Sequence, residues 1–272
     1  MKLLPTLALA ATIAASVAGC ATTTSPTGRT QYVGAVSQAQ LDQLGAQAFA
    51  EMKAKKQQTS NAGQRNYVAC VTNAIVAQLT PEWRSRGAWE TAVFVDAEPN
   101  AFALPGGKVG VYTGIFTVAK TQDQLAGVIA HEIGHVVARH HDERITRQMG
   151  ASTALQVGGA LLGSAYGDGA ANAAVQGGGI LAQTGFLLPG SRAQESEADV
   201  VGQQLMARAG FDPRGAVALW QNMIAAGGSR PPQWLSTHPD PQARIGELQG
   251  RAQRLVPEYE QARAAGRRPA CG

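Results

Sequence analysis

The sequence predicts an α+β fold that is mostly helical and carries a small β-sheet. Apolar residues recur at helical spacing in several long runs, the clearest of which is Thr121–Arg144. Two shorter runs, Glu90–Asp96 and Lys108–Thr113, are instead rich in β-branched and aromatic residues, as strands are. The formal net charge of +4, without a run of five basic residues, gives no indication of a nucleic-acid partner.

Residues 1–19 have the composition of a lipoprotein signal peptide. Lys2 supplies a positive start, an Ala-rich apolar stretch follows, and the segment ends Val17-Ala18-Gly19-Cys20. This ending resembles the bacterial lipobox, whose cysteine is lipidated and becomes the mature N-terminus. Ordinary signal cleavage beside an incidental Cys20 is the alternative. Ala21 resembles the sorting signal for the outer membrane, so we expect an outer-membrane lipoprotein of a Gram-negative bacterium that faces the periplasm.

The mature chain is expected to consist of a tether and one domain. Residues 20–36 are rich in Thr, Ser, Gly and Pro, which is typical of a flexible linker, and residues 37–272 would form the domain. Amphipathic helices are expected over Ser37–Lys56 and from about Ala62 to Leu79, with Pro81 ending the second.

The two β-rich runs are expected to be extended strands near a turn. Pro105-Gly106-Gly107 is the turn signal before Lys108–Thr113. A strand edge at this place could bind an extended peptide by backbone pairing. A hairpin that merely packs under the next helix explains the same pattern.

Thr121–Arg144 is expected to be one helix, begun by a Thr121 N-cap, and it contains the motif His131-Glu132-Ile133-Gly134-His135. Positions i and i+4 share a helix face, so the two histidines can bind one zinc ion. Glu132 remains available as a general base for the metal's water. Two solvated histidines on a polar helix face are the alternative, and His140 and His141 are expected to be solvated helix-end residues.

A catalytic zinc ion needs a third protein ligand. Glu195 and Asp199 are four residues apart in a predicted helix, so Glu195 could bind the metal while Asp199 accepts the free N–H of a ligating histidine. An exposed acidic helix start is the alternative. The preceding Gly-rich segment, residues 149–191, is expected to form two loosely packed helices that act as a lid, or else a membrane-contacting patch.

Two cysteines remain once Cys20 is lipidated. Cys70 and Cys271 are an even pair in an oxidising compartment, so a disulfide would attach the C-terminal tail to the predicted second helix. Two unpaired thiols are the alternative.

The motifs together resemble one family. H-E-x-x-H, followed about 60 residues later by E-x-x-A-D and preceded by Asn100–Gly107, resembles the HtpX/CAAX-prenyl-endopeptidase family of gluzincin zinc metallopeptidases. The lipobox makes the chain similar to its periplasmic lipoprotein branch. The resemblance covers roughly Ala62 to Leu248 and implies a zincin-type domain with a small sheet beside the zinc helix, and one Zn2+ per chain. It implies zinc ligands His131, His135 and Glu195, the general base Glu132, and the substrate-binding residues Asn100, Ala101, Phe102 and Ala103.

Residues Ser236–Arg244 are similar to the T-H-P-x-P-x-x-R loop of that branch, in which the histidine can move onto the zinc. The resemblance therefore makes His238 a candidate regulatory ligand. The alternative is that His238 lies in a rigid turn beside prolines and has no regulatory role. Beyond this loop we expect only a helix near Gln242–Arg254 and a basic tail, in place of the helical repeats of some relatives.

The implied function is a zinc-dependent endopeptidase, anchored to the outer membrane, that hydrolyses misfolded or stalled envelope proteins as part of protein quality control. Its expected partners are those unfolded proteins and, through the lipid anchor, the membrane. The alternative from another class is a zinc-bearing chaperone or assembly factor whose protease site His238 keeps latent.

Overall fold

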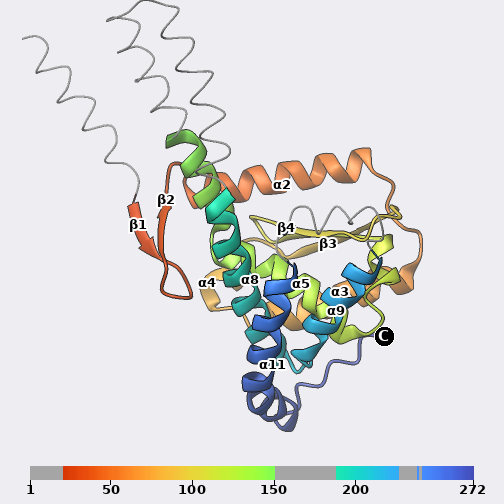
Figure 1. Ribbon diagram of the computed structural model, residues 1–272. Helices are drawn as coiled ribbons and strands as arrows, with labels where there is room; N and C mark the ends of the chain where they lie inside the picture. Colours follow the sequence, from red (N-terminus) through yellow and green to blue (C-terminus); the bar gives the residue numbers. More distant parts are fainter. Residues whose placement is uncertain (1–20, 151–187, 227–237, 239–240) are drawn as a thin grey trace, which may run out of the picture. The chain divides into compact units, whose positions relative to one another are not determined.

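The computed structural model describes residues 21–150, 188–226, 238 and 241–272 (Figure 1). The expected signal peptide, the expected lipidation residue Cys20 and most of the Gly-rich segment 149–191 lie outside these residues. The packing of the chain separates two units. One comprises Met1–Gln38 and His141–Leu188, and the other comprises Ala39–His140 and Pro189–Gly272.

The first unit contains a hairpin where the composition predicted a flexible tether. Strands β1 (Ala21–Thr24) and β2 (Thr30–Val33) pair antiparallel, with Ala21 opposite Val33. The turn between them places Gly28 at a φ of 88°, which glycine adopts without strain. The hairpin differs from the predicted flexible tether because the threonines that suggested a linker are β-branched, and β-branched residues favour strands.

Buried polar contacts hold this hairpin to the helical residues 141–150 of the same unit. Both oxygens of the buried Glu143 carboxylate accept hydrogen bonds of 2.7 Å from the Arg29 guanidinium. The Asp142 carboxylate accepts the backbone N–H of Gly34 at 2.9 Å. A paired charge can be buried in this way, whereas an isolated one cannot.

The second unit is built on a three-stranded sheet, as the predicted fold class requires. Strands β3 (Glu90–Phe94), β4 (Ala101–Leu104) and β5 (Lys108–Tyr112) lie in the order β3-β5-β4. β3 pairs parallel to β5, and β4 pairs antiparallel to it through the predicted Pro-Gly-Gly turn. Within the described residues, β4 is therefore an edge strand.

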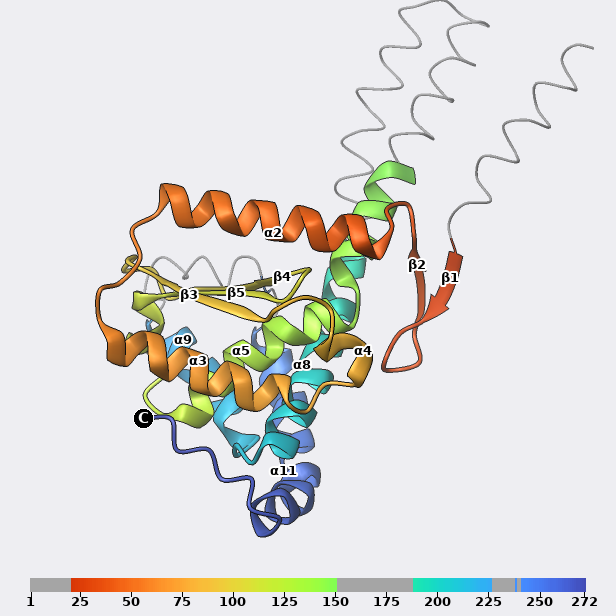
Figure 2. The same ribbon diagram turned by 180° about the vertical axis from the view of Figure 1, so that it is seen from behind.

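Helices cover both faces of this sheet (Figure 2). Helix α2 (Gln38–Lys55) lies on one face, where an aromatic cluster of Phe49, Phe94, Phe102 and Tyr112 packs. Helices α3 (Ala62–Val76) and α5 (Gln122–Val137) lie on the other face and enclose the larger apolar core. Two short helical segments connect the sheet to its helices: α4 (Pro81–Arg84) lies between α3 and β3, and η2 (Thr113–Thr117) lies between β5 and α5.

Helix α5 is shorter than predicted. The Thr121 side chain caps it as expected, by accepting the backbone N–H of Gln124 at 3.3 Å. It ends at Val137, and Arg139 adopts a φ of 56° before residues 140–150 become helical again. The prediction of one helix over Thr121–Arg144 was wrong. The positive φ of Arg139 interrupts the helix, and the spacing of apolar residues does not reveal this interruption.

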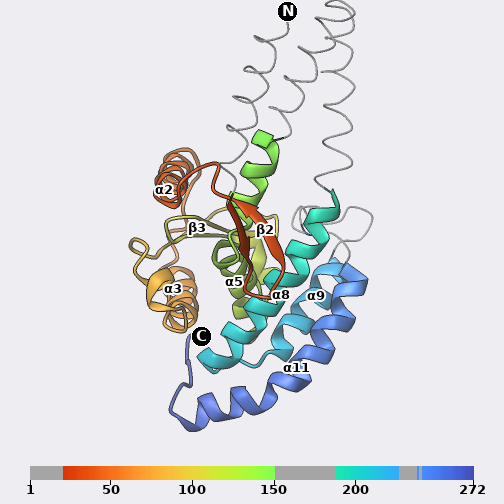
Figure 3. The same ribbon diagram turned by 90° about the vertical axis from the view of Figure 1, so that its left-hand side faces the viewer.

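In the described residues after position 187, three further helices follow (Figure 3): α8 (Leu188–Ala209), α9 (Arg214–Ala226) and α11 (Pro241–Ala264). Helix α11 runs well past the predicted end near Arg254, and Ala262 is still buried beyond Pro257. None of the helices in the described part of the chain has both the length and the hydropathy of a membrane span.

The C-terminal tail is attached to α3 and α5. The Sγ atoms of Cys70 and Cys271 lie 2.07 Å apart, at disulfide distance. The Gln122 side chain accepts the backbone N–H of Cys271 at 3.0 Å and donates to the Pro269 carbonyl at 2.9 Å. The tail is thus fixed covalently and by hydrogen bonds.

Candidate metal centre

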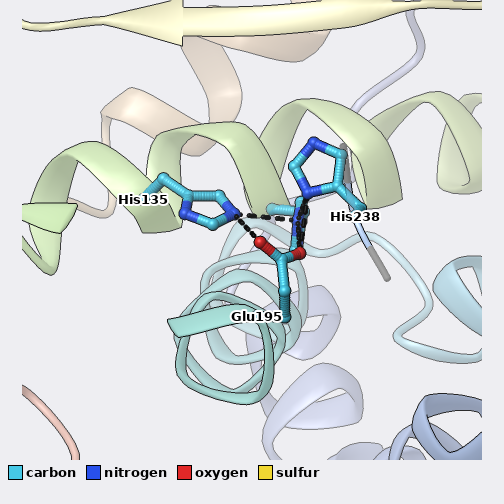
Figure 4. A group of neighbouring side chains, drawn as sticks. His135, Glu195 and His238 are labelled. Atoms are coloured by element: carbon cyan, nitrogen blue, oxygen red, sulfur yellow. Dashed lines mark hydrogen bonds and ion pairs between the residues drawn. The ribbon is translucent and has the colours of Figure 1, made fainter. Parts of the chain in front are cut away.

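Side chains from three parts of the chain meet at a buried cluster on α5. His131 and His135 come from α5, Glu195 from α8, and His238 from the residues that precede α11. Figure 4 shows His135, Glu195 and His238 pointing toward one another. Each of the four residues offers one ligand atom, and these atoms lie within 4.8 Å of one another. The structure therefore brings together the three predicted zinc ligands and the candidate regulatory histidine.

Two glycines let α8 approach α5 closely enough for this. A Cβ atom on Gly202 would lie 2.9 Å from the backbone nitrogen of His131, and one on Gly134 would lie 2.8 Å from the carbonyl oxygen of Ala198. Such separations are too short for a side chain, so the approach depends on glycine at both positions. The ligands on the two helices meet for this reason.

The distances between the donor atoms fit a zinc ion. Bonds of about 2.0–2.1 Å in tetrahedral geometry separate neighbouring ligand atoms by about 3.3 Å. The Nε2 atoms of His131 and His135 are 3.1 Å apart, and each lies 3.4 Å from a Glu195 oxygen. Two imidazoles and one carboxylate are also a donor set that zinc prefers. The residues present therefore suit the metal that the sequence predicted.

His238 lies at the fourth side of this group. Its Nδ1 is 3.2 Å from Nε2 of His131 and 2.7 Å from an oxygen of Glu195. Its Nε2 lies 3.3 Å from Oε1 of Glu132. The Glu132 side chain is buried beside the cluster but is not among the grouped ligand atoms. His238 thus contacts both the ligand set and the predicted general base.

Asp199 and Arg244 support the group from behind. Nδ1 of His131 lies 2.9 Å from an Asp199 oxygen, which is compatible with the predicted role of that carboxylate. The Arg244 guanidinium donates to both Asp199 oxygens, at 2.8 and 2.7 Å, and to Glu195 at 3.0 Å, while it stacks 4.1 Å from the Trp220 ring. The importance of Arg244 was missed, although the T-H-P-x-P-x-x-R motif already contained it.

His140 also belongs to this region, contrary to the prediction that it is solvated. It is 1% exposed, and its ring lies between His135 and Glu197. A residue five positions after a helical histidine would normally point elsewhere, so only the backbone break at Arg139 reveals this contact.

The charges of the cluster favour a cation. Burial by itself raises the pKa of the Glu195 carboxyl, but hydrogen bonds from His131, His135 and His238 hold it well below its usual range. Burial lowers the pKa of the His131 imidazole, whereas Asp199 and Glu195 raise it, to a net value of about 9. Burial lowers the pKa of His135. The Glu195 carboxylate therefore stays ionised and the His135 imidazole stays neutral, which are the forms that bind a metal ion.

The predicted substrate-binding residues lie on and before the edge strand β4. The Asn100 carbonyl accepts the backbone N–H of Tyr112 at 2.9 Å. The Ala101 and Ala103 side chains are buried in the core that includes α5, and Phe102 packs in the aromatic cluster under α2. Any contact of Ala101 or Ala103 with a peptide would therefore use the β4 backbone and not their buried side chains.

Comparison with known proteins agrees with this centre. The sequence model of Peptidase family M48 matches residues 62–252. This range includes all the candidate ligands of the centre. The chain is 41% identical over 163 residues to the mitochondrial metalloendopeptidase OMA1 of Schizosaccharomyces pombe, covering 59% of this chain and 46% of that protein. It is 35% identical over 165 residues to the beta-barrel assembly-enhancing protease of Escherichia coli K12, covering 59% of this chain and 34% of that protein. The chain thus matches about half, or less, of the length of these relatives.

Proposed function

Since the chain belongs to peptidase family M48, we propose that it is a zinc-dependent endopeptidase that hydrolyses misfolded or stalled envelope proteins. The observation that carries this proposal is the convergence of His131, His135 and Glu195 at separations suited to tetrahedral zinc. The names of the relatives, a metalloendopeptidase and a beta-barrel assembly-enhancing protease, support the chemistry and, for the second relative, a link to protein assembly.

Each residue of the centre has a distinct task in this proposal. A bound zinc ion would supply Lewis acidity that polarises the peptide carbonyl and acidifies a water molecule. Glu132 accepts the proton of the attacking water and passes it to the leaving amine. Asp199, fixed by Arg244, keeps the proton of His131 on Nδ1, so that Nε2 is available as a ligand. The outer edge of β4 offers backbone groups to an extended substrate.

His238 would close this site in its resting state. Its imidazole is a competent fourth ligand, and its distances of 3.2 Å to His131 and 2.7 Å to Glu195 place it at the ligand set. Its approach to Glu132 also occupies the space beside the general base. Cleavage would therefore require His238 to move away. This arrangement is also what favours the second candidate function, a zinc-bearing chaperone or assembly factor with a latent site.

We place the enzyme at the periplasmic face of the outer membrane, as a lipoprotein of the branch that its lipobox resembles. The support is the sequence of residues 1–21, with Cys20 as the lipidated residue. The hairpin β1–β2 would then follow the lipid anchor directly.

Proteolysis of unfolded casein by the purified full-length chain in detergent tests the proposal. Cleavage should disappear when a chelator removes the metal and return when zinc is restored. Cleavage only by His238→Ala would establish the closed resting state. If neither protein cleaves casein although both contain zinc, the endopeptidase proposal fails and the chaperone function is favoured.

A further inference from the structure

His140 and Glu197 form a buried pair next to His135. They are 1% and 3% exposed, and Nε2 of His140 lies 3.1 Å from an oxygen of Glu197. Nδ1 of the same ring lies 2.8 Å from Nδ1 of His135, and the two rings meet edge to face. We propose that His140 and Glu197 are positioning residues that fix the tautomer and the orientation of His135 for metal binding, an inference that rests on the proposed zinc site.

When His135 binds a metal, the hydrogen bonds that join His135, His140 and Glu197 allow only one arrangement of their protons. Nε2 of His135 faces the ligand group, so a neutral ring must carry its proton on Nδ1. That proton is donated to Nδ1 of His140, which must then be an acceptor. The proton of His140 therefore lies on Nε2 and is donated to the Glu197 carboxylate. The Glu197 carboxylate thus influences His135 through hydrogen bonds to the neutral imidazole of His140, which lies between them.

The backbone is shaped to make this contact. In an uninterrupted helix, residues five positions apart point about 140° away from each other, so His135 and His140 would not meet. Helix α5 instead ends at Val137, and Arg139 adopts a φ of 56°, which is uncommon for a residue with a side chain. This turn brings the His140 ring back to His135. A strained backbone conformation beside a candidate ligand is the pattern expected where function requires it.

The two ligating histidines are consequently oriented in different ways. His131 contacts a carboxylate directly, at 2.9 Å from Asp199, whereas His135 reaches its carboxylate through His140. Partners of this kind hold a ligand's ring in place and raise its basicity. Their loss commonly weakens metal affinity about 10–100-fold.

The test measures the dissociation constant for zinc of the full-length chain, by competition with a chromophoric chelator. Glu197→Gln keeps the shape of the side chain but removes its charge, and His140→Phe removes the acceptor for His135. Each should weaken zinc binding about tenfold or more. His140→Gln, which can accept and donate at similar positions, should restore most of the affinity. Glu247→Gln is the matched control, because Glu247 contacts α8 from an exposed position through Ser196.

A purely structural pair would lower the unfolding temperature of the metal-free protein but leave the zinc affinity of the folded variants unchanged. Parental affinity in both Glu197→Gln and His140→Phe would therefore overturn the inference, without affecting the proposed function. Failure of the unaltered protein to bind zinc would instead overturn the metal site itself.

The tautomer can also be read in the unaltered protein, so the test does not depend on whether the variants fold. The chain has five histidines, which selective 15N labelling resolves by NMR. In the zinc-loaded protein, His140 should carry its proton on Nε2 and not on Nδ1. A proton on Nδ1 of His140 would contradict the proposed chain of hydrogen bonds.

Discussion

Replacing Arg244 by alanine should destabilise the metal-free protein by about 3–5 kcal/mol, the range for removing one partner of a buried ion pair. Arg244 is 4% exposed, and its guanidinium makes hydrogen bonds of 2.8 and 2.7 Å to Asp199 and of 3.0 Å to Glu195. Both carboxylates are buried, so the substitution would remove the guanidinium that compensates part of their negative charge. Each hydrogen bond to a charged group is worth about 1.5–3 kcal/mol. The expected loss of about 3–5 kcal/mol is therefore no larger than the contribution of two such bonds.

Arg208 provides the comparison that separates burial from charge. Its guanidinium donates to Glu258 at 2.8 Å, but the two side chains are 46% and 33% exposed. An exposed pair of this kind contributes about 0–1 kcal/mol. Arg244→Lys should fall between the two alanine variants, because it keeps the charge but loses the planar fork and the stacking on Trp220.

Urea denaturation of the metal-free proteins, followed by circular dichroism, gives the free energies of unfolding. The loss for Arg244→Ala should exceed the loss for Arg208→Ala by at least about 2 kcal/mol. Equal losses for the two variants would show that the buried guanidinium is not needed to compensate the carboxylates.

Three other predictions follow from the same structure. Gly202→Ala should cost about 1–3 kcal/mol of stability and weaken zinc binding, because the added methyl group would lie 2.9 Å from the His131 nitrogen; parental unfolding and affinity would contradict this. The double variant Cys70→Ser, Cys271→Ser should lose about 2–4 kcal/mol of stability, and the parent should lose as much under reducing conditions. An unchanged denaturation midpoint would argue against a stabilising disulfide. His238→Ala should raise the rate of casein cleavage about tenfold or more, because a preference of only about 1.4 kcal/mol for the closed state already hides about nine sites in ten. A rate equal to the parent's would contradict the closed resting state.

Periodicity and turn chemistry account for the parts of the fold that could be predicted. The apolar spacing predicted helices close to α2 and α3 and the start of α5, and the β-rich runs predicted strands with the turn Pro105-Gly106-Gly107. The residues of the candidate centre could be found because a histidine pair four positions apart must share a helix face. Their chemistry depends on residue types that the sequence states directly.

The remaining features depend on contacts that no local pattern encodes. The parallel pairing of β3 with β5 follows from tertiary packing, and the burial of His140 follows from one positive φ at Arg139. The hairpin β1–β2 was missed because its threonines suit a linker by composition and a strand by shape. Arg244 was missed as a support because nothing in the spacing shows that α11 brings it to Asp199.

The most direct test of the account compares two proteins in which the proposed closure by His238 has been removed. His238→Ala and the double variant Glu132→Gln, His238→Ala are purified with equal zinc content and incubated with unfolded casein. His238→Ala should cleave casein, and the double variant, with its metal retained, should not, because it lacks the carboxylate that accepts the proton of the attacking water. Cleavage by the double variant at the rate of His238→Ala would contradict the assignment of Glu132 and, with it, the proposed mechanism.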